Sequence, residues 1–301
     1  HQGHRVFLDT SEPTGTLTPM GPSYEPLLAD ERASFDGKPS GMRERFTPAM
    51  LADVDRSQVD LVHEFAVDYA DDYYRVNYFV DPASHDDFPD DTDCTAVLYS
   101  LILDYGYTAH SLANVALDDM LTNVNSDGIV KTYWASPDDD RARIIDPVVC
   151  ANVLYLATQL SRTPELGPTL FYLRDVLVSG EWHKGSRYYH SPDTLLWRLA
   201  RSVPKERCPM TALVVDAITS RVGSSDNVFD ASQRVLAAHR YGLVFESDAN
   251  LVLGTNTPAV DSLIRLGRSG TYLQAHDLVK ATHAAAVRCL ITDATALAEQ
   301  S

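Results

Sequence analysis

Residues 86–103 read DDFPDDTDCTAVLYSLIL, in which five carboxylates within eight positions lead into a largely apolar run. Carboxylates packed this closely repel one another unless a divalent cation, a bound proton or bulk water neutralises them. The first two solutions indicate chemistry, and the third indicates a solvated helix cap. An acidic start followed by a helix that is apolar on nearly every side recurs along the chain, and this recurrence predicts the fold.

The predicted helices alternate between two kinds. Apolar helices with acidic or capping starts are expected at Thr92–Tyr105, Asp146–Leu160, Ser191–Ser202, Asp226–Tyr241 and Asp277–Ile291. More polar helices are expected between them, at Ala109–Asn123, Leu166–Ser179 and Pro209–Val222. The spacing of roughly 40 to 50 residues is typical of helical-hairpin repeats. The apolar helices suit an inner ring and the amphipathic ones an outer ring. The sequence therefore predicts an all-α fold, a single α/α toroid, with an irregular helical bundle as the alternative.

The chain divides into two parts by composition. Residues 1–45 are rich in Pro, Gly, Ser and Thr and show little periodicity, so they are predicted to form an irregular, extended arm. Residues 46–301 are predicted to form one α/α-toroid catalytic domain.

Charge and composition limit the classes of partner. The formal net charge of -17 argues against nucleic acids and anionic membranes, which bind basic surfaces. No apolar run reaches the ~20 residues that cross a bilayer, so no membrane anchor is expected. The 4 cysteines are widely spaced and are interpreted as reduced thiols of a cytoplasmic protein. The oligomeric state is not determined by these features.

The acidic helix starts are expected to meet at one mouth of the toroid. The helix dipoles there favour an anion. Carboxylates and an anion attract each other only through cations, so the combination predicts Mg²⁺ between protein oxygens and a phosphate. The predicted metal ligands are Asp90, Asp91, Asp93 and Asp146. The alternative is that such residues only cap helices.

Two further segments carry candidate substrate contacts. Arg187 precedes Tyr188 and Tyr189, where a guanidinium could bind phosphate and aromatic faces could stabilise a carbocation. The alternative is an aromatic cluster that only packs the rim. Lys280 lies in an otherwise apolar helix, where it either reaches a cavity or an anion, or extends to solvent.

Residues 91–96, DTDCTA, resemble the acidic motif of class II terpene cyclases of the squalene-cyclase type. In that family the middle Asp is the Brønsted acid, which would be Asp93, with Cys94 as a hydrogen-bond neighbour. The family fold is an α/α toroid. Its established members have two such domains, whereas this chain has room for one.

The order of segments also resembles non-canonical sesquiterpene cyclases of the humulene-synthase type. The matching segments are 89–93, 146–154, 187–193 and the Gly-containing stretch before the last helix. This resemblance implies loss of diphosphate from farnesyl diphosphate with Mg²⁺, with Lys280 or His276 holding the diphosphate. The other expected substrate contacts are Asn152, Arg187, Tyr188 and Tyr189. Residues 86–90 also match the DDxxD pattern of class I synthases.

Three enzyme classes follow from these observations. The preferred one is a Mg²⁺-dependent sesquiterpene synthase, a lyase acting on a prenyl diphosphate, with Asp91, Asp93 and Lys280 as catalytic residues. The second is a class II cyclase in which Asp93 protonates an alkene and the diphosphate is retained. The third is a carbohydrate-active α/α barrel using paired carboxylates. A non-enzymatic helical scaffold is the residual class.

Overall fold

The computed structural model describes residues 46–56, 75–78, 88–106, 109–206, 208–225, 227–256 and 272–298. The predicted arm over 1–45 lies outside the described residues, as do Asp86, Asp87 and the Gly-containing stretch before the last helix.

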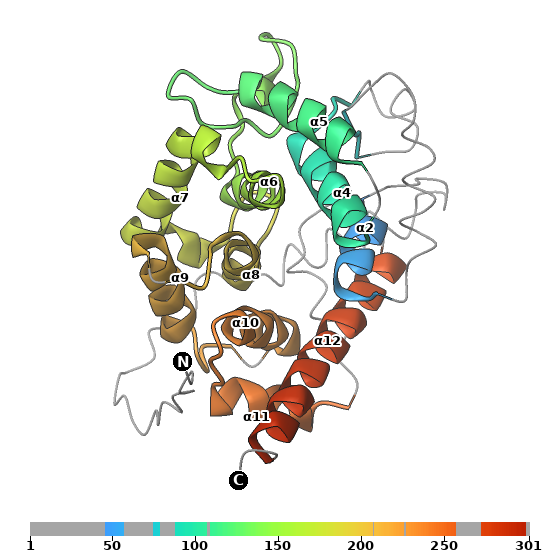
Figure 1. Ribbon diagram of the computed structural model, residues 1–301, viewed down its shortest axis with the longest axis vertical. Helices are drawn as coiled ribbons and strands as arrows, with labels where there is room; N and C mark the ends of the chain where they lie inside the picture. Colours follow the sequence, from blue (N-terminus) through green and yellow to red (C-terminus); the bar gives the residue numbers. More distant parts are fainter. Residues whose placement is uncertain are drawn as a thin grey trace, which may run out of the picture.

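The described part of the chain is built from helices (Figure 1). The even-numbered α-helices are α2 (Phe46–Val54), α4 (Thr92–Asp104), α6 (Pro147–Gln159), α8 (Pro192–Ser202), α10 (Val228–Arg240) and α12 (Tyr272–Ala298). The odd-numbered ones are α5 (His110–Thr122), α7 (Gly167–Ser179), α9 (Pro209–Ser220) and α11 (Glu246–Gly254). Three short 3₁₀ helices, η2 (Asp140–Arg143), η3 (Thr163–Leu166) and η4 (Glu181–Lys184), lie in the connections. β-Structure within these residues is limited to isolated bridges, so the all-α prediction is confirmed.

The even-numbered helices contact one another in cyclic order. α4 packs on α6, α6 on α8, α8 on α10 and α10 on α12; α12 then packs on α2, and α2 on α4. The odd-numbered helices lie outside this series, with α5, α7 and α9 along the periphery in Figure 1. This order of contacts is the one that the predicted toroid requires, and the full double ring over the undescribed segments stays a prediction.

Burial separates the two sets of helices. Eleven of the 13 residues of α4 are buried, against four of the 13 in α5. The same contrast holds for α6, with nine buried residues, and α7, with four. An apolar run on all sides therefore marks a helix that is enclosed by neighbours, as expected for an inner ring.

Side-chain caps fix where two of the even-numbered helices begin. The Asp91 carboxylate accepts the backbone N–H of Cys94 at 2.6 Å and starts α4. Asp146 accepts the N–H of Val148 at 2.8 Å and starts α6. Both residues satisfy N–H groups that a helix leaves unpaired in its first turn. Capping therefore accounts for part of the acidic pattern in the sequence.

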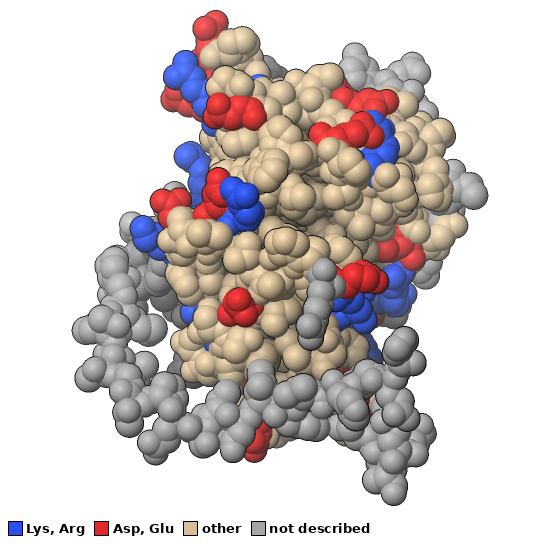
Figure 2. Space-filling model, turned by 60° about the vertical axis from the view of Figure 1, so that its left-hand side comes forward, with Lys and Arg blue, Asp and Glu red and all other residues tan. Residues whose placement is uncertain are grey.

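The surface of the outer helices mixes the two signs of charge. On the face in Figure 2, acidic and basic side chains lie beside one another. Among the described residues, Arg162 pairs with Asp118 and Arg174 pairs with Asp175. None of the described helices is both long enough and apolar enough to cross a bilayer.

Candidate active site

Asp93 lies at the centre of the candidate site, in the first turn of α4. Its side chain is buried, and the residue is 8% exposed. Oδ1 accepts the Nδ2–H of Asn152 from α6 at 2.7 Å, and Oδ2 accepts the hydroxyl of Tyr189 from the loop before α8. The structure therefore brings three of the predicted site residues together from three separate segments.

Asp91 lies beside Asp93 and is held through its backbone. Its N–H donates to the carbonyl of Val76 at 3.1 Å, and it also bridges to Tyr133. Its Oδ1 caps α4, whereas its buried Oδ2 has no hydrogen-bond partner among the described residues. An ionised carboxylate with an unpartnered, buried oxygen is costly, so this environment favours the protonated form.

Burial controls the protonation of this pair. It raises the pKa of Asp93 to about 6, although the hydrogen bonds from Tyr189 and Asn152 act in the opposite direction. Burial, followed by the neighbouring charge of Asp93, raises the pKa of Asp91 to about 8. Two carboxyls in this arrangement retain at least one proton near neutral pH.

Asp146 supports the site from the start of α6. Its second oxygen accepts the backbone N–H of Tyr188 at 3.3 Å, so the carboxylate ties α6 to the loop that carries Tyr189. Burial raises the pKa of Asp146.

The described carboxylates do not fit a Mg²⁺ ion. Both oxygens of Asp93 and both of Asp146 accept hydrogen bonds from protein donors, and Asp90 accepts the side-chain amide of Asn77 at 3.2 Å. Among the described residues, Asp91 Oδ2 is the one buried carboxylate oxygen without a hydrogen-bond partner, and a single such oxygen does not make a metal site. Within the described ranges, no group of three or more His, Cys, Asp or Glu side chains is arranged to hold a metal. We therefore derive no step through magnesium, which stays a prediction.

An aromatic cluster lies next to Asp91. Tyr133 contacts Phe88 and Tyr188 edge-to-face, with ring centroids 5.6 and 6.0 Å away. The guanidinium of Arg141 lies 5.3 Å from the Phe88 centroid, and that of the exposed Arg187 lies 5.8 Å from the Tyr188 centroid. Tyr188 thus belongs to this cluster, whereas Tyr189 contacts the acid.

Lys280 and His276 of α12 are the two residues predicted to hold the diphosphate. The Lys280 side chain is exposed, which is the solvent-facing alternative considered for it. The side chain of His276 lies outside the described residues.

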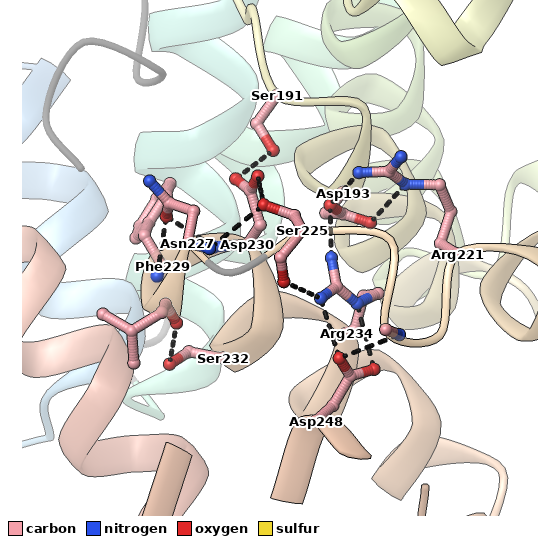
Figure 3. A network of polar contacts seen from close by, with 12 residues as sticks. Ser191, Asp193, Arg221, Ser225, Asn227, Phe229, Asp230, Ser232, Arg234 and Asp248 are labelled. Carbon is pink, nitrogen blue, oxygen red and sulfur yellow. Dashed lines mark hydrogen bonds and ion pairs between the residues drawn. The ribbon is translucent and has the colours of Figure 1, made fainter. Parts of the chain in front are cut away.

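A buried charge cluster joins the start of α8 to the end of α9, the middle of α10 and the start of α11 (Figure 3). Asp193 pairs with Arg234 at 2.8 Å and with Arg221 at 2.9 Å. Arg234 is fully buried and also pairs with Asp248 at 2.7 Å. Neither arginine nor Asp248 was predicted from the sequence, although Arg234 lies in the middle of a helix predicted to be buried, where an Arg is uncommon unless it is paired.

A second buried network joins α2 to α8. Asp53 pairs with Arg198 at 2.6 Å and with Arg201 at 2.5 Å, and Arg201 also reaches Asp104 of α4 at 3.1 Å. Burial alone would raise the pKa of Asp53, but Arg201 and Arg198 hold it below its ordinary value. Sequence analysis did not assign a role to these residues.

Comparison with known proteins relates this region to terpene cyclases. Residues 33–159 match the family described as sesquiterpene cyclase astC-like C-terminal domain. Drimenol cyclase drtB of Aspergillus calidoustus is 32% identical over 183 residues, which cover 58% of this chain and 33% of that protein. The matched part thus spans about a third of the length of this curated relative. The part of the chain that carries Asp91, Asp93 and Asn152 is therefore similar to terpene cyclases.

A solved structure supports the fold independently. A crystal structure of a protein from Actinoplanes superposes with a TM-score of 0.55 over 88% of this chain and 99% of that chain, at 16% identity. At that identity the likeness concerns the fold alone. The relation to terpene cyclases therefore rests on the two sequence similarities, and the humulene-synthase-type resemblance stays a prediction.

Proposed function

We propose that this chain is a terpene cyclase domain in which Asp93 protonates an alkene of a sesquiterpene-length prenyl diphosphate. The observation that carries the proposal is the buried Asp93 carboxyl, with its pKa raised to about 6, held between Asn152 and Tyr189. An acid that must protonate a weakly basic alkene has to carry its proton when the substrate binds, and burial raises the pKa of Asp93 toward that state. The similarity to sesquiterpene cyclases supports the substrate class.

The protonation step needs only groups that the chain itself supplies. The alkene π electrons take the proton from the Asp93 carboxyl, and the more substituted carbon becomes a cation. A second alkene of the same substrate attacks this cation and closes a ring. Water then takes a proton from the carbon next to the new cation, and the electrons of that C–H bond form the alkene of the product. The Asp93 carboxylate left behind is stabilised by the donors on Asn152 and Tyr189. No carbon–oxygen bond breaks, so the diphosphate stays on the product.

The competing reaction is ionisation of the same substrate with Mg²⁺, the class preferred from the sequence. It breaks the carbon–oxygen bond and releases diphosphate. The hydrogen bonds from protein donors that occupy both oxygens of Asp93 and of Asp146 weigh against metal binding at these residues. The two sequence similarities, to the astC-like family and to drimenol cyclase drtB, favour a terpene cyclase over the carbohydrate-active alternative.

The fate of the diphosphate tests the proposal. The protein is incubated with farnesyl diphosphate and Mg²⁺, and free diphosphate is measured alongside cyclised products recovered before and after phosphatase treatment. We expect cyclised products only after phosphatase treatment and no stoichiometric release of diphosphate. Asp93→Asn should abolish cyclisation, whereas Asp138→Asn, at an exposed carboxyl, should not. Release of one diphosphate per cyclised hydrocarbon would contradict the proposal.

A further inference from the structure

Tyr189 reaches Asp93 from a loop that is fixed on its N-terminal side. The backbone N–H of Ser186 donates to the Tyr189 carbonyl at 2.6 Å, and the Tyr189 N–H donates to the Ser186 hydroxyl at 3.1 Å. Gly185 has φ +72°, and a Cβ there would lie 2.2 Å from the His190 carbonyl oxygen. This closely packed turn leaves the backbone of Tyr189 little freedom to move.

The C-terminal side of the loop is fixed by the buried charge cluster. Ser191 occupies the N-cap position of α8, yet its hydroxyl makes no capping bond. It donates instead to the Asp230 carboxylate of α10 at 2.8 Å (Figure 3). Two residues further on, Asp193 is paired with Arg234 and Arg221. A serine at this position normally accepts a hydrogen bond from a backbone N–H of its own helix. The Ser191 hydroxyl instead joins the start of α8 to α10.

Stability alone is a poor explanation for this cluster. Asp193, Arg234 and Asp230 have no exposed surface, and Asp248 is 1% exposed. Desolvating charges costs about as much as their pairing returns, so apolar replacements of buried ion pairs are often neutral or stabilising. Ion pairs and hydrogen bonds are directional, so they hold the groups that they join in one defined geometry. Here they join the start of α8 to α10 and α11. The N-cap residue of α8, Ser191, is two residues beyond Tyr189.

We propose that Ser191 and Arg234 are positioning residues that fix the start of α8 so that the Tyr189 hydroxyl stays on the Asp93 carboxyl. Neither residue contacts Asp93 in the contacts described, and both act through Tyr189. The inference rests on the proposed function, because the consequence for turnover follows from Asp93 being the acid. Holding a catalytic group within about 1 Å of its working place is worth up to about a hundredfold in rate.

A double-mutant cycle tests whether Ser191 acts through Tyr189. We expect Tyr189→Phe to lower kcat about a hundredfold and Ser191→Ala about tenfold, with KM changed little in both. In the Tyr189→Phe background, Ser191→Ala should cost less than about twofold, since the contact it positions is already gone. Ser191→Thr, which keeps a hydroxyl, should restore most of kcat. Equal losses from Ser191→Ala in both backgrounds would overturn the inference.

A matched control comes from α10, the helix that carries Asp230. Ser232 of α10 is also fully buried, but its hydroxyl donates only within its own helix, to the Val228 carbonyl at 2.6 Å (Figure 3). Ser232→Ala should leave kcat within about twofold of the unmodified protein. A tenfold loss from this control would show that any change in buried packing has the same effect, and would also overturn the inference.

The effect of Ser191 on Tyr189 can also be measured without an activity assay. The same four variants of the cycle are unfolded in denaturant, and the coupling between Ser191 and Tyr189 is taken from their free energies of unfolding. If the unmodified protein converts no prenyl diphosphate, the proposed function fails while this coupling still reports on the positioning. Additive free energies together with additive effects on kcat would contradict the positioning and leave the proposed function standing.

Discussion

At the scale of the residue, two influences act on the Asp93 carboxyl in opposite directions. Removal from water favours the protonated acid, whereas the donors on Tyr189 and Asn152 favour the carboxylate. The acid thereby keeps a proton in mildly acidic solution, and its carboxylate is still stabilised once that proton has been transferred. This compromise is suited to a group that must donate a proton and then recover it.

The pKa of Asp93 predicts how the proposed cyclisation depends on pH. Because only protonated Asp93 can donate, kcat/KM should fall as pH rises through about 6. Tyr189→Phe removes a hydrogen bond that stabilises the carboxylate, so the midpoint should move to higher pH even though the maximal rate is lower. A kcat/KM profile of each protein measures both effects.

The neighbouring tyrosine provides the control for this shift. Tyr188 contacts Tyr133 edge-to-face, and its described contact with the site is a backbone N–H to Asp146. Tyr188→Phe should therefore leave the midpoint where it is. An unchanged midpoint in Tyr189→Phe, or an equal shift in Tyr188→Phe, would contradict the assignment of Tyr189.

The buried Asp91 carboxyl should lower the free energy of unfolding as the pH rises. Its pKa rises from 3.8 to about 8 on folding, so the folded protein holds a proton that the unfolded chain has lost between these values. Stability should therefore fall as pH rises from about 4 to about 8. Asp91→Asn keeps a good helix cap and removes the charge, so it should raise the free energy of unfolding at about pH 8.5 and change it little at about pH 4. Denaturant melts at the two pH values measure this, and an equal change at both would contradict it.

At the scale of the element, the turn that carries Tyr189 depends on Gly185. Gly185→Ala places a methyl group against the His190 carbonyl, which should displace Tyr189 and lower kcat at least about tenfold. Gly242 has the same φ of +72°, but a Cβ added there would meet nothing within 4 Å. Gly242→Ala carries the same backbone strain, about 1 kcal/mol, without the clash. Comparable kcat values for the two variants would contradict the role assigned to the turn.

The helices themselves were predictable from the sequence because local patterns determine them. The apolar helix predicted at Thr92–Tyr105 is α4 together with its C-cap residue, and that predicted at Asp146–Leu160 is α6 together with the cap residues at both of its ends. Helix α2 was not delimited in advance. Nine residues are too few for a clear period, and α2 is identified as part of the inner series by its contacts with α4 and α12.

At the scale of the whole molecule, the buried Asp53 network should contribute strongly to stability. Asp53→Asn removes the negative charge that Arg198 and Arg201 share, so both buried guanidinium groups lose this ion pair. Breaking a buried pair in this way costs about 3 to 5 kcal/mol. Calorimetric or denaturant unfolding measures the loss. Asp175→Asn, in an exposed pair with Arg174, should cost under about 1 kcal/mol, and equal losses would contradict this account.

The candidate site was only partly predictable, for reasons that lie at this scale. The motif around Asp93 is local, so the sequence could single out its carboxylates. The partners of Asp93 lie 59 and 96 positions away, and nothing local specifies that Asn152 and Tyr189, rather than Tyr188 or Lys280, reach it. The pairing of Asp193 with Arg234 is likewise a product of helix packing. Several residues of the site could therefore be predicted from the sequence, but the hydrogen bonds and ion pairs between them could not.

The contact between Asp53 and Arg198 joins positions 145 apart in the chain. Neighbouring helices can pair soon after they form, but this contact must wait until the intervening helices have been ordered, because long loops are slow to close. Docking of α2 should therefore be among the last events in folding. In a refolding experiment, helical circular dichroism should recover before the native environment of the aromatic side chains does.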